Sequence, residues 1–259
     1  MNASTTATII LSHGSHDQNG LIEFKKAFQV FESIADQPVL TYGFLELIQP
    51  TISDALTYVT HFPITTIILI QSFLLNANHT KNDIPKILKN FSQHHPKYHL
   101  KISKPLSANL QILELIKASI TTVEQSSKTS ISRENTLVIL VGRGTSDPLA
   151  NAWSLEVAQH LQNILKFKQI AVSFATSVEP KLQTVLKQAD SSRTQRIIIV
   201  PLLLWSGTVY SRILESIHQG QAQKADIEWL VTPPLGTHPL LPHVWQDLSP
   251  LAQQASSIE

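Results

Sequence analysis

The chain has 259 residues, which is enough for one large domain or two domains of ordinary size. With 42% hydrophobic and 15% charged residues, its composition excludes a disordered or fibrous protein. It carries 20 Lys and Arg against 19 Asp and Glu, with no basic block, so we expect no nucleic-acid partner.

The sequence contains no cysteine, which excludes disulfides, thiolate nucleophiles and cysteine-ligated metal centres. Any metal ion must therefore be bound by histidines and carboxylates. The first residues form no positively charged leader, and no apolar run approaches the roughly 20 residues that span a bilayer. We expect a cytoplasmic protein that has no membrane partner.

In the first half of the chain, short apolar runs alternate with helical patterns. Runs rich in β-branched residues predict strands near 7–12, 38–44, 66–72 and 98–102. An apolar stripe of period near 3.6 predicts the first helix, and its residues are Leu21, Phe24, Phe28 and Phe31. Pro50 suits the first turn of a second helix, and a closing helix is expected over about 108–122. Continuously apolar strands that alternate with helices predict a parallel sheet covered on both faces.

The second half repeats this plan. Ile10–Asp17 resembles Leu140–Asp147 at an offset of 143 − 13 = 130, and the same offset superposes Phe44 on Phe174 and Pro50 on Pro180 without a gap. Strands are predicted near 136–141, 170–175, 196–203 and 227–231, with a closing helix near 239–254. One helical stripe between them consists of Trp153, Val157, Leu161 and Leu165.

The duplication predicts an α/β protein of two similar tandem lobes. Each lobe is expected to be a parallel four-stranded sheet flanked by helices. We predict an N-terminal lobe over 1–124, a polar Ser/Thr-rich linker over 125–135 and a degenerate C-terminal lobe over 136–259. Because the two lobes already pair within one chain, we expect a monomer that is an internal pseudo-dimer.

Three candidate ligands follow three successive predicted strands. His13 comes after the first strand, Glu46 after the second, and His79 in the loop after the third. Because ligands bind outside the carboxyl ends of parallel strands, we expect these side chains to converge. Two imidazoles and a carboxylate suit divalent ions such as Co²⁺, Fe²⁺, Ni²⁺ or Zn²⁺ and leave coordination positions open. The sequence therefore predicts a site that handles a metal ion transiently.

The second copy serves as an internal control for this site. At the offset of 130, His13 becomes Arg143, Glu46 becomes Thr176 and His79 becomes Val209. Gly14/Gly144 and Asp17/Asp147 are retained, which is typical of a tight turn followed by a helix cap. We interpret His16 as a surface group. The histidine-rich segment 94–99 is interpreted as a solvated turn, because it lies at the opposite edge of the predicted sheet.

With these residues identified, the sequence resembles the sirohydrochlorin chelatases, the class II tetrapyrrole chelatases of CbiX type, in their long two-repeat form. The resemblance covers nearly the whole chain, and it implies that the two lobes are flavodoxin-like and face a central cleft. It is carried by Ser12-His13-Gly14-Ser15, by Phe44-Leu45-Glu46 with Pro50, and by 67–75 leading to His79 and Asp83-Ile84-Pro85. Asn78 stands where the family pattern has glycine, and Gln71 stands where a proline is common.

The resemblance implies a lyase that inserts Co²⁺ or Fe²⁺ into sirohydrochlorin for cobalamin or sirohaem synthesis, with no permanently bound cofactor. It implies that His13 and His79 are the catalytic, metal-binding histidines, while Glu46 balances charge or passes protons outward. Sirohydrochlorin carries eight carboxylates. We therefore expect cations at the site, with Arg143 placed across the cleft from His13 as the first candidate, and Lys81 and Arg212 as others.

Three other functions share a feature with this sequence. A carrier protein that holds a tetrapyrrole or a metal ion without turnover would share the fold and the ligands. A hydrolase could use a His-Gly pair after a strand, but the chain has no Gly-x-Ser-x-Gly elbow. A histidine phosphatase would require Arg-His-Gly, and residue 12 is a serine.

Overall fold

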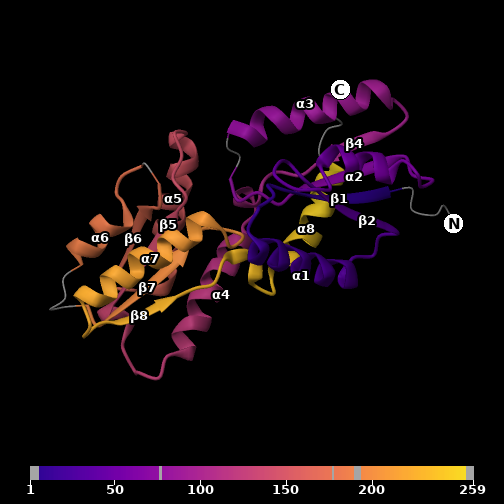
Figure 1. The fold of residues 1–259 in the computed structure, drawn as a ribbon. Coiled ribbons are helices and arrows are strands. Elements are labelled where there is room, and N and C mark those ends of the chain that lie inside the picture. Colours follow the sequence, from indigo (N-terminus) through magenta and orange to yellow (C-terminus); the bar gives the residue numbers. More distant parts are fainter. Residues whose placement is uncertain (1–5, 76–77, 177, 190–193, 255–259) are drawn as a thin grey trace. The chain divides into compact units, whose positions relative to one another are not determined.

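A computed structural model describes the backbone of residues 6–75, 78–176, 178–189 and 194–254, and the side chains of all these residues except 78–80 and 250–254. The chain divides into two compact units (Figure 1). Unit 1 contains Met1–Leu110 and Pro239–Glu259, and unit 2 contains Gln111–His238. No helix in the described part of the chain combines the length and the hydrophobicity needed to cross a membrane.

Unit 1 is built on a parallel four-stranded sheet with the strand order β2-β1-β3-β4. Its strands are β1 (Thr6–Ser12), β2 (Val39–Phe44), β3 (Thr66–Gln71) and β4 (His99–Ile102). Its helices are α1 (Gln18–Ile34), α2 (Ile52–Val59), α3 (Asn78–His94) and α8 (Leu241–Gln254). Helices α1 and α8 pack together on the sheet, and α2 contacts α3, so helices cover both faces as predicted.

Unit 2 repeats the arrangement with the strand order β6-β5-β7-β8. Its strands are β5 (Thr136–Gly142), β6 (Gln169–Phe174), β7 (Arg196–Pro201) and β8 (Glu228–Val231). Its helices are α4 (Gln111–Ser126), α5 (Pro148–Leu165), α6 (Leu182–Gln188) and α7 (Thr208–Gln223). Short 3₁₀ turns lie at Leu106–Ala108, Arg133–Asn135 and Leu235–Thr237. The eight strands fall within one or two residues of the predicted ones.

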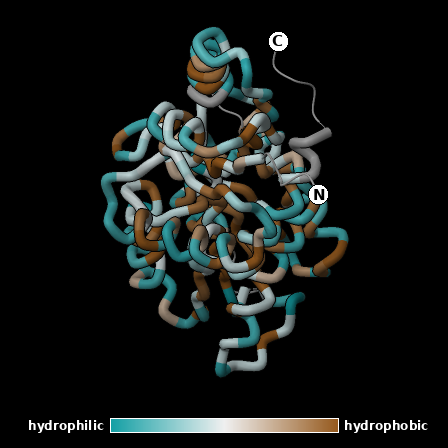
Figure 2. The backbone as a smooth tube through the Cα atoms, turned by 90° about the vertical axis from the view of Figure 1, so that its right-hand side faces the viewer, coloured by the Kyte–Doolittle hydropathy of each residue, from teal (hydrophilic) through white to brown (hydrophobic). Residues whose placement is uncertain are grey.

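The strands of both sheets form hydrophobic cores from which water is excluded. Central strand β1 is buried from Ala7 to Ser12, and β5 is buried along its whole length. In Figure 2, brown, hydrophobic segments are frequent in the inner part of the view, and teal, hydrophilic segments are frequent on its outer loops. Buried runs of this kind are typical of parallel strands covered on both faces. The predicted fold class is confirmed.

The closing helices belong to different units from those predicted. Helix α4 follows the strands of unit 1 in the chain but packs on β7, β8 and α5 of unit 2. Helix α8 follows unit 2 but packs on β3, β4 and α1 of unit 1. The predicted boundaries at 124 and 136 are therefore corrected to crossings near residues 110 and 238. Sequence periodicity defines the apolar face of a helix, but it does not select between two equivalent sheets.

Residues 125–135, predicted as a linker, lie within unit 2 and are held there by a buried arginine. Arg196 on β7 is 2% exposed and pairs with Glu228 on β8. The Arg196 guanidinium also donates to Thr129 O at 2.9 Å and to Ile131 O at 3.2 Å. Glu228 Oε1 accepts from the hydroxyls of Ser127 and Thr129. The polar segment is therefore docked by hydrogen bonds to the buried Arg196 and to its partner Glu228.

Candidate functional site

The strand order of unit 1 defines where a ligand can bind. The chain passes from β1 to β2 on one side and then to β3 on the other side, so the topology reverses between β1 and β3. Helices that start from neighbouring strands diverge at such a reversal and leave a crevice at the carboxyl ends of the strands. His13 directly follows β1, and Glu46 follows β2 by two residues. Both therefore lie at this edge, as predicted.

Main-chain hydrogen bonds extend the pairing of β1 and β2 up to these two residues. Leu45 N donates to Ser12 O at 2.8 Å, and Glu46 N donates to His13 O at 3.1 Å. The backbones of His13 and Glu46 are thereby fixed side by side. Their side chains meet, because His13 Nδ1 lies 3.3 Å from Glu46 Oε1. The predicted convergence holds for this pair.

The His13–Glu46 pair is partly open to solvent, with exposed fractions of 34% and 44% for the two side chains. Nδ1 of His13 is itself shielded from solvent. The 3.3 Å approach of Glu46 Oε1 to Nδ1 does not meet hydrogen-bond geometry, but an imidazole and a carboxylate side by side are both ligands for first-row divalent ions. The pair can thus bind an ion, and it can also accept a proton.

Gly14 allows the His13 loop to approach Glu46. Its φ is +92°, and an added Cβ would lie 2.2 Å from the Glu46 carbonyl oxygen. Asp17 then caps α1 by accepting from Gly20 N at 3.0 Å. Both roles were predicted from the retained Gly and Asp. Pro50 differs from the prediction, because it is a cis proline that precedes the N-cap residue Thr51 rather than a residue of the first turn of α2.

His79 is the second residue of α3, and not a loop residue as predicted. Its side chain lies outside the described residues, so its convergence with His13 stays a prediction. Among the described side chains, no group of three or more potential ligands of the His, Cys, Asp and Glu type is found. Lys81, on the same helix, has an exposed side chain.

Unit 2 keeps the backbone of this site and replaces its chemistry. Thr176 N donates to Arg143 O at 3.1 Å, which matches the hydrogen bond between Glu46 and His13. Thr176 Oγ1 turns back to donate to the carbonyl oxygens of Arg143 and Gly144. The Thr176 hydroxyl, which stands in place of the Glu46 carboxylate, therefore donates its hydrogen bonds to the neighbouring main chain. Arg143 follows β5 and has an exposed side chain.

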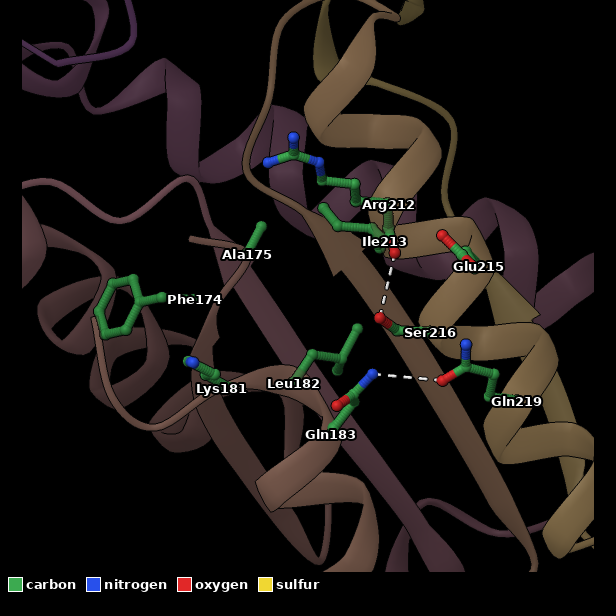
Figure 3. A pocket seen from close by; sticks show the side chains of 10 residues that line it. All are labelled: Phe174, Ala175, Lys181, Leu182, Gln183, Arg212, Ile213, Glu215, Ser216 and Gln219. Carbon is green, nitrogen blue, oxygen red and sulfur yellow. Dashed lines mark hydrogen bonds between the residues drawn. The ribbon is translucent and has the colours of Figure 1, made fainter. Parts of the chain in front are cut away.

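A hollow of about 370 Å³ lies between α6 and α7 in unit 2 (Figure 3). Arg212 on α7 and Lys181, directly before α6, both line it. Gln183 and Gln219 are hydrogen-bonded at 3.2 Å beside them. Among the described residues, neither the Lys181 ammonium nor the Arg212 guanidinium has a carboxylate within ion-pair distance. Sequence reasoning missed Lys181, because only the packing of α6 against α7 brings it near Arg212.

Other histidines interpreted from the sequence are His16 and those of the segment 94–99. His16 is exposed on the surface. In the segment 94–99, which joins the end of α3 to the start of β4, the His95 ring stacks on Phe91 at 4.5 Å between centroids, and the Tyr98 hydroxyl donates to Thr60 O. This segment is at the amino end of β4, away from His13.

The CbiX family model matches both repeats, over residues 7–123 and 137–249. A sirohydrochlorin ferrochelatase of Priestia megaterium is 26% identical over 92% of this chain and 87% of its own length. A sirohydrochlorin cobaltochelatase of the same organism is 24% identical over 91% of this chain and 76% of its own. The structure titled "SirB from Bacillus subtilis with Fe3+" superposes with a TM-score of 0.83, at 23% identity, over 95% of each chain. This last similarity supports the two-unit fold.

Proposed function

We propose, since the chain belongs to the CbiX family, that it is a sirohydrochlorin chelatase that inserts Co²⁺ or Fe²⁺ into the macrocycle. The observation that carries the proposal is the His13–Glu46 pair at the carboxyl edge of unit 1, with Nδ1 and Oε1 3.3 Å apart. Relatives that match over most of their length bear the names of both the ferrochelatase and the cobaltochelatase. Both ions are therefore proposed as substrates.

The chemistry requires an ion donor and a proton acceptor at one place. When M²⁺ enters the macrocycle, four ring nitrogens bind it and two pyrrole N–H protons leave. His13, Glu46 and His79 are proposed to hold the ion with an incomplete shell, so that ring nitrogens can replace protein ligands one at a time. An imidazole released from the ion becomes a base for a pyrrole proton. Glu46, adjacent to Nδ1 of His13, stabilises the charge that the ring then carries.

The carboxylates of the substrate require cations. We assign Arg143, Lys81 and Arg212 to this role, and we add Lys181 because it shares a hollow with Arg212. Arginine binds a carboxylate through two parallel hydrogen bonds, which favours Arg143 and Arg212 as orienting contacts.

The test is metal insertion followed by absorbance, with Co²⁺ in air and with Fe²⁺ under anaerobic conditions. We expect His13→Ala and His79→Ala to abolish the enzymatic rate. His16→Ala is the matched control, since it removes an exposed histidine three residues from His13, and its rate should equal that of the wild type. A wild type that binds the macrocycle but inserts neither ion faster than the protein-free reaction would refute the chelatase and favour a carrier.

We further propose that the chain acts as a monomer, because two similar units already occur within it. Light scattering coupled to gel filtration should give the mass of one chain. A stable dimer at micromolar concentration would contradict this proposal.

A further inference from the structure

The residue directly after Glu46 adopts a backbone conformation that is unfavourable for its type. Leu47 has a φ of +74°, one of two positive φ values among the described non-glycine residues. Ile48 N donates to Glu46 O at 2.9 Å across it, which closes a three-residue γ-turn. With a positive φ at its central residue, this turn is rare and strained. Glycine, asparagine and aspartate tolerate positive φ, whereas leucine does not.

The strained turn also leaves an apolar side chain in water. Leu47 is 51% exposed, at a position where glycine would be free of strain and a polar residue would be better solvated. Neither the backbone nor the hydrophobic core of unit 1 gains from this arrangement. A strained residue that its surroundings hold in place is a reason to look for a ligand contact.

The surroundings of Leu47 hold the turn rigidly. The Glu46 carbonyl oxygen accepts from Ile48 N, and Gly14 packs so closely that any Cβ there would collide with the same oxygen at 2.2 Å. Glu46 N is meanwhile bonded to His13 O at 3.1 Å. Leu47 is thus fixed relative to the proposed metal ligands. The equivalent residue of unit 2, Ser177, lies outside the described residues.

We propose that Leu47 is an apolar contact for the face of the tetrapyrrole macrocycle and sets its position over the His13–Glu46 pair. The inference rests on the proposed chelatase function. An ion held by His13 and Glu46 can pass to a macrocycle only if the ring centre comes close to both side chains, and the ring then covers the residues that adjoin them. Leu47 adjoins Glu46 and offers the planar, largely apolar ring a hydrophobic surface that would otherwise stay in water.

Leu47→Gly separates this role from a structural one. Glycine relieves the positive φ, so the midpoint of thermal unfolding should be equal to or higher than that of the wild type. The contact is lost, so the KM for sirohydrochlorin and the Kd measured by fluorescence quenching without metal should both rise about tenfold, the ratio that corresponds to 1.4 kcal/mol. The kcat should be unchanged, because a contact made equally before and during insertion affects binding alone. Leu47→Met, which keeps the apolar contact, should retain the wild-type KM.

Val30→Ala is the matched control. Val30 is 46% exposed on α1, in the half of the helix that runs away from the carboxyl edge of the sheet. Its replacement should leave the KM and the Kd unchanged. If Leu47→Gly leaves both constants at the wild-type value while the wild type inserts metal, the contact is refuted and the chelatase stands. If the wild type binds no macrocycle at all, the proposed function fails first, and the inference fails with it.

Discussion

Replacing Gly14 by alanine should disable the proposed metal site through the backbone of Glu46. The added Cβ would lie 2.2 Å from the Glu46 carbonyl oxygen, against a lower limit of 3.0 Å for real contacts, so the two segments must separate by about 0.8 Å. The oxygen cannot rotate away, because it belongs to the main chain and accepts from Ile48 N. The separation strains the hydrogen bond from Glu46 N to His13 O.

The magnitude follows from two contributions. Alanine at a φ of +92° costs about 1–2 kcal/mol. The displaced Glu46 backbone and its weakened hydrogen bond add about 1 kcal/mol. The expected loss in free energy of unfolding is therefore about 2–3 kcal/mol, with a loss of Co²⁺ affinity of at least about tenfold, in line with the effect of displacing partners of metal ligands.

Gly144→Ala provides the internal comparison. Gly144 has a φ of +82°, so alanine carries the same conformational cost, but its Cβ would meet the Thr176 Oγ1 side-chain atom at 2.9 Å. We expect a loss of about 1–2 kcal/mol and unchanged Co²⁺ affinity. Urea unfolding followed by circular dichroism and titration calorimetry with Co²⁺ measure the two quantities. Equal destabilisation by both substitutions, with Co²⁺ affinity retained in Gly14→Ala, would refute the reasoning.

Three further predictions concern the stability of the units. Burial raises the pKa of Glu228, but hydrogen bonds from Ser127, Thr129 and Arg196 outweigh this effect and lower the pKa. The stability that the Glu228 carboxylate contributes is therefore complete above the unfolded pKa and is lost as the pH falls through the folded pKa. Glu228→Gln should cost about 3 kcal/mol in urea unfolding at pH 7 and less as the pH falls through the folded pKa of Glu228; a cost independent of pH would contradict this. Burial lowers the pKa of His238, so the unfolded state binds a proton more readily than the folded state. The stability of the wild type should therefore decline as the pH falls through the ordinary histidine pKa, and His238→Gln should flatten that decline in thermal melts. Trp245→Ala should lower the free energy of unfolding by about 3–5 kcal/mol, and Trp245→Phe should lower it clearly less. The reason is that the buried indole packs on Phe31 and donates to Ser72 Oγ at 3.1 Å. Equal losses for the two variants would show that the aromatic ring contributes little.

The sequence was sufficient to predict the two sheets and the meeting of His13 with Glu46 for one physical reason. In parallel sheets, apolar runs identify the strands, and residues that follow neighbouring strands must meet at the same edge. His13 and Glu46 satisfy this rule, and their hydrogen-bonded backbones confirm it. The offset of 130 gave the same geometry for Arg143 and Thr176.

Other features depend on interactions that no local pattern encodes. The positive φ of Leu47 could not be predicted, because leucine is an unusual residue for that conformation. The hollow that joins Lys181 to Arg212 exists only once α6 packs against α7. The docking of residues 127–131 depends on the buried Arg196, which the sequence places in a strand like any other basic residue.

The exchange of closing helices reverses the order in which the units can be completed during synthesis. Domains usually fold from the amino terminus onward as the chain emerges. Here the contiguous unit is the second one, Gln111–His238. Unit 1 lacks α8 until the residues that follow unit 2 in the chain are made. The indole of Trp245 then reaches the aromatic side chains of α1, more than two hundred residues earlier in the chain. The proposed metal ligands His13 and Glu46 therefore remain on an unfinished unit until α8 is made.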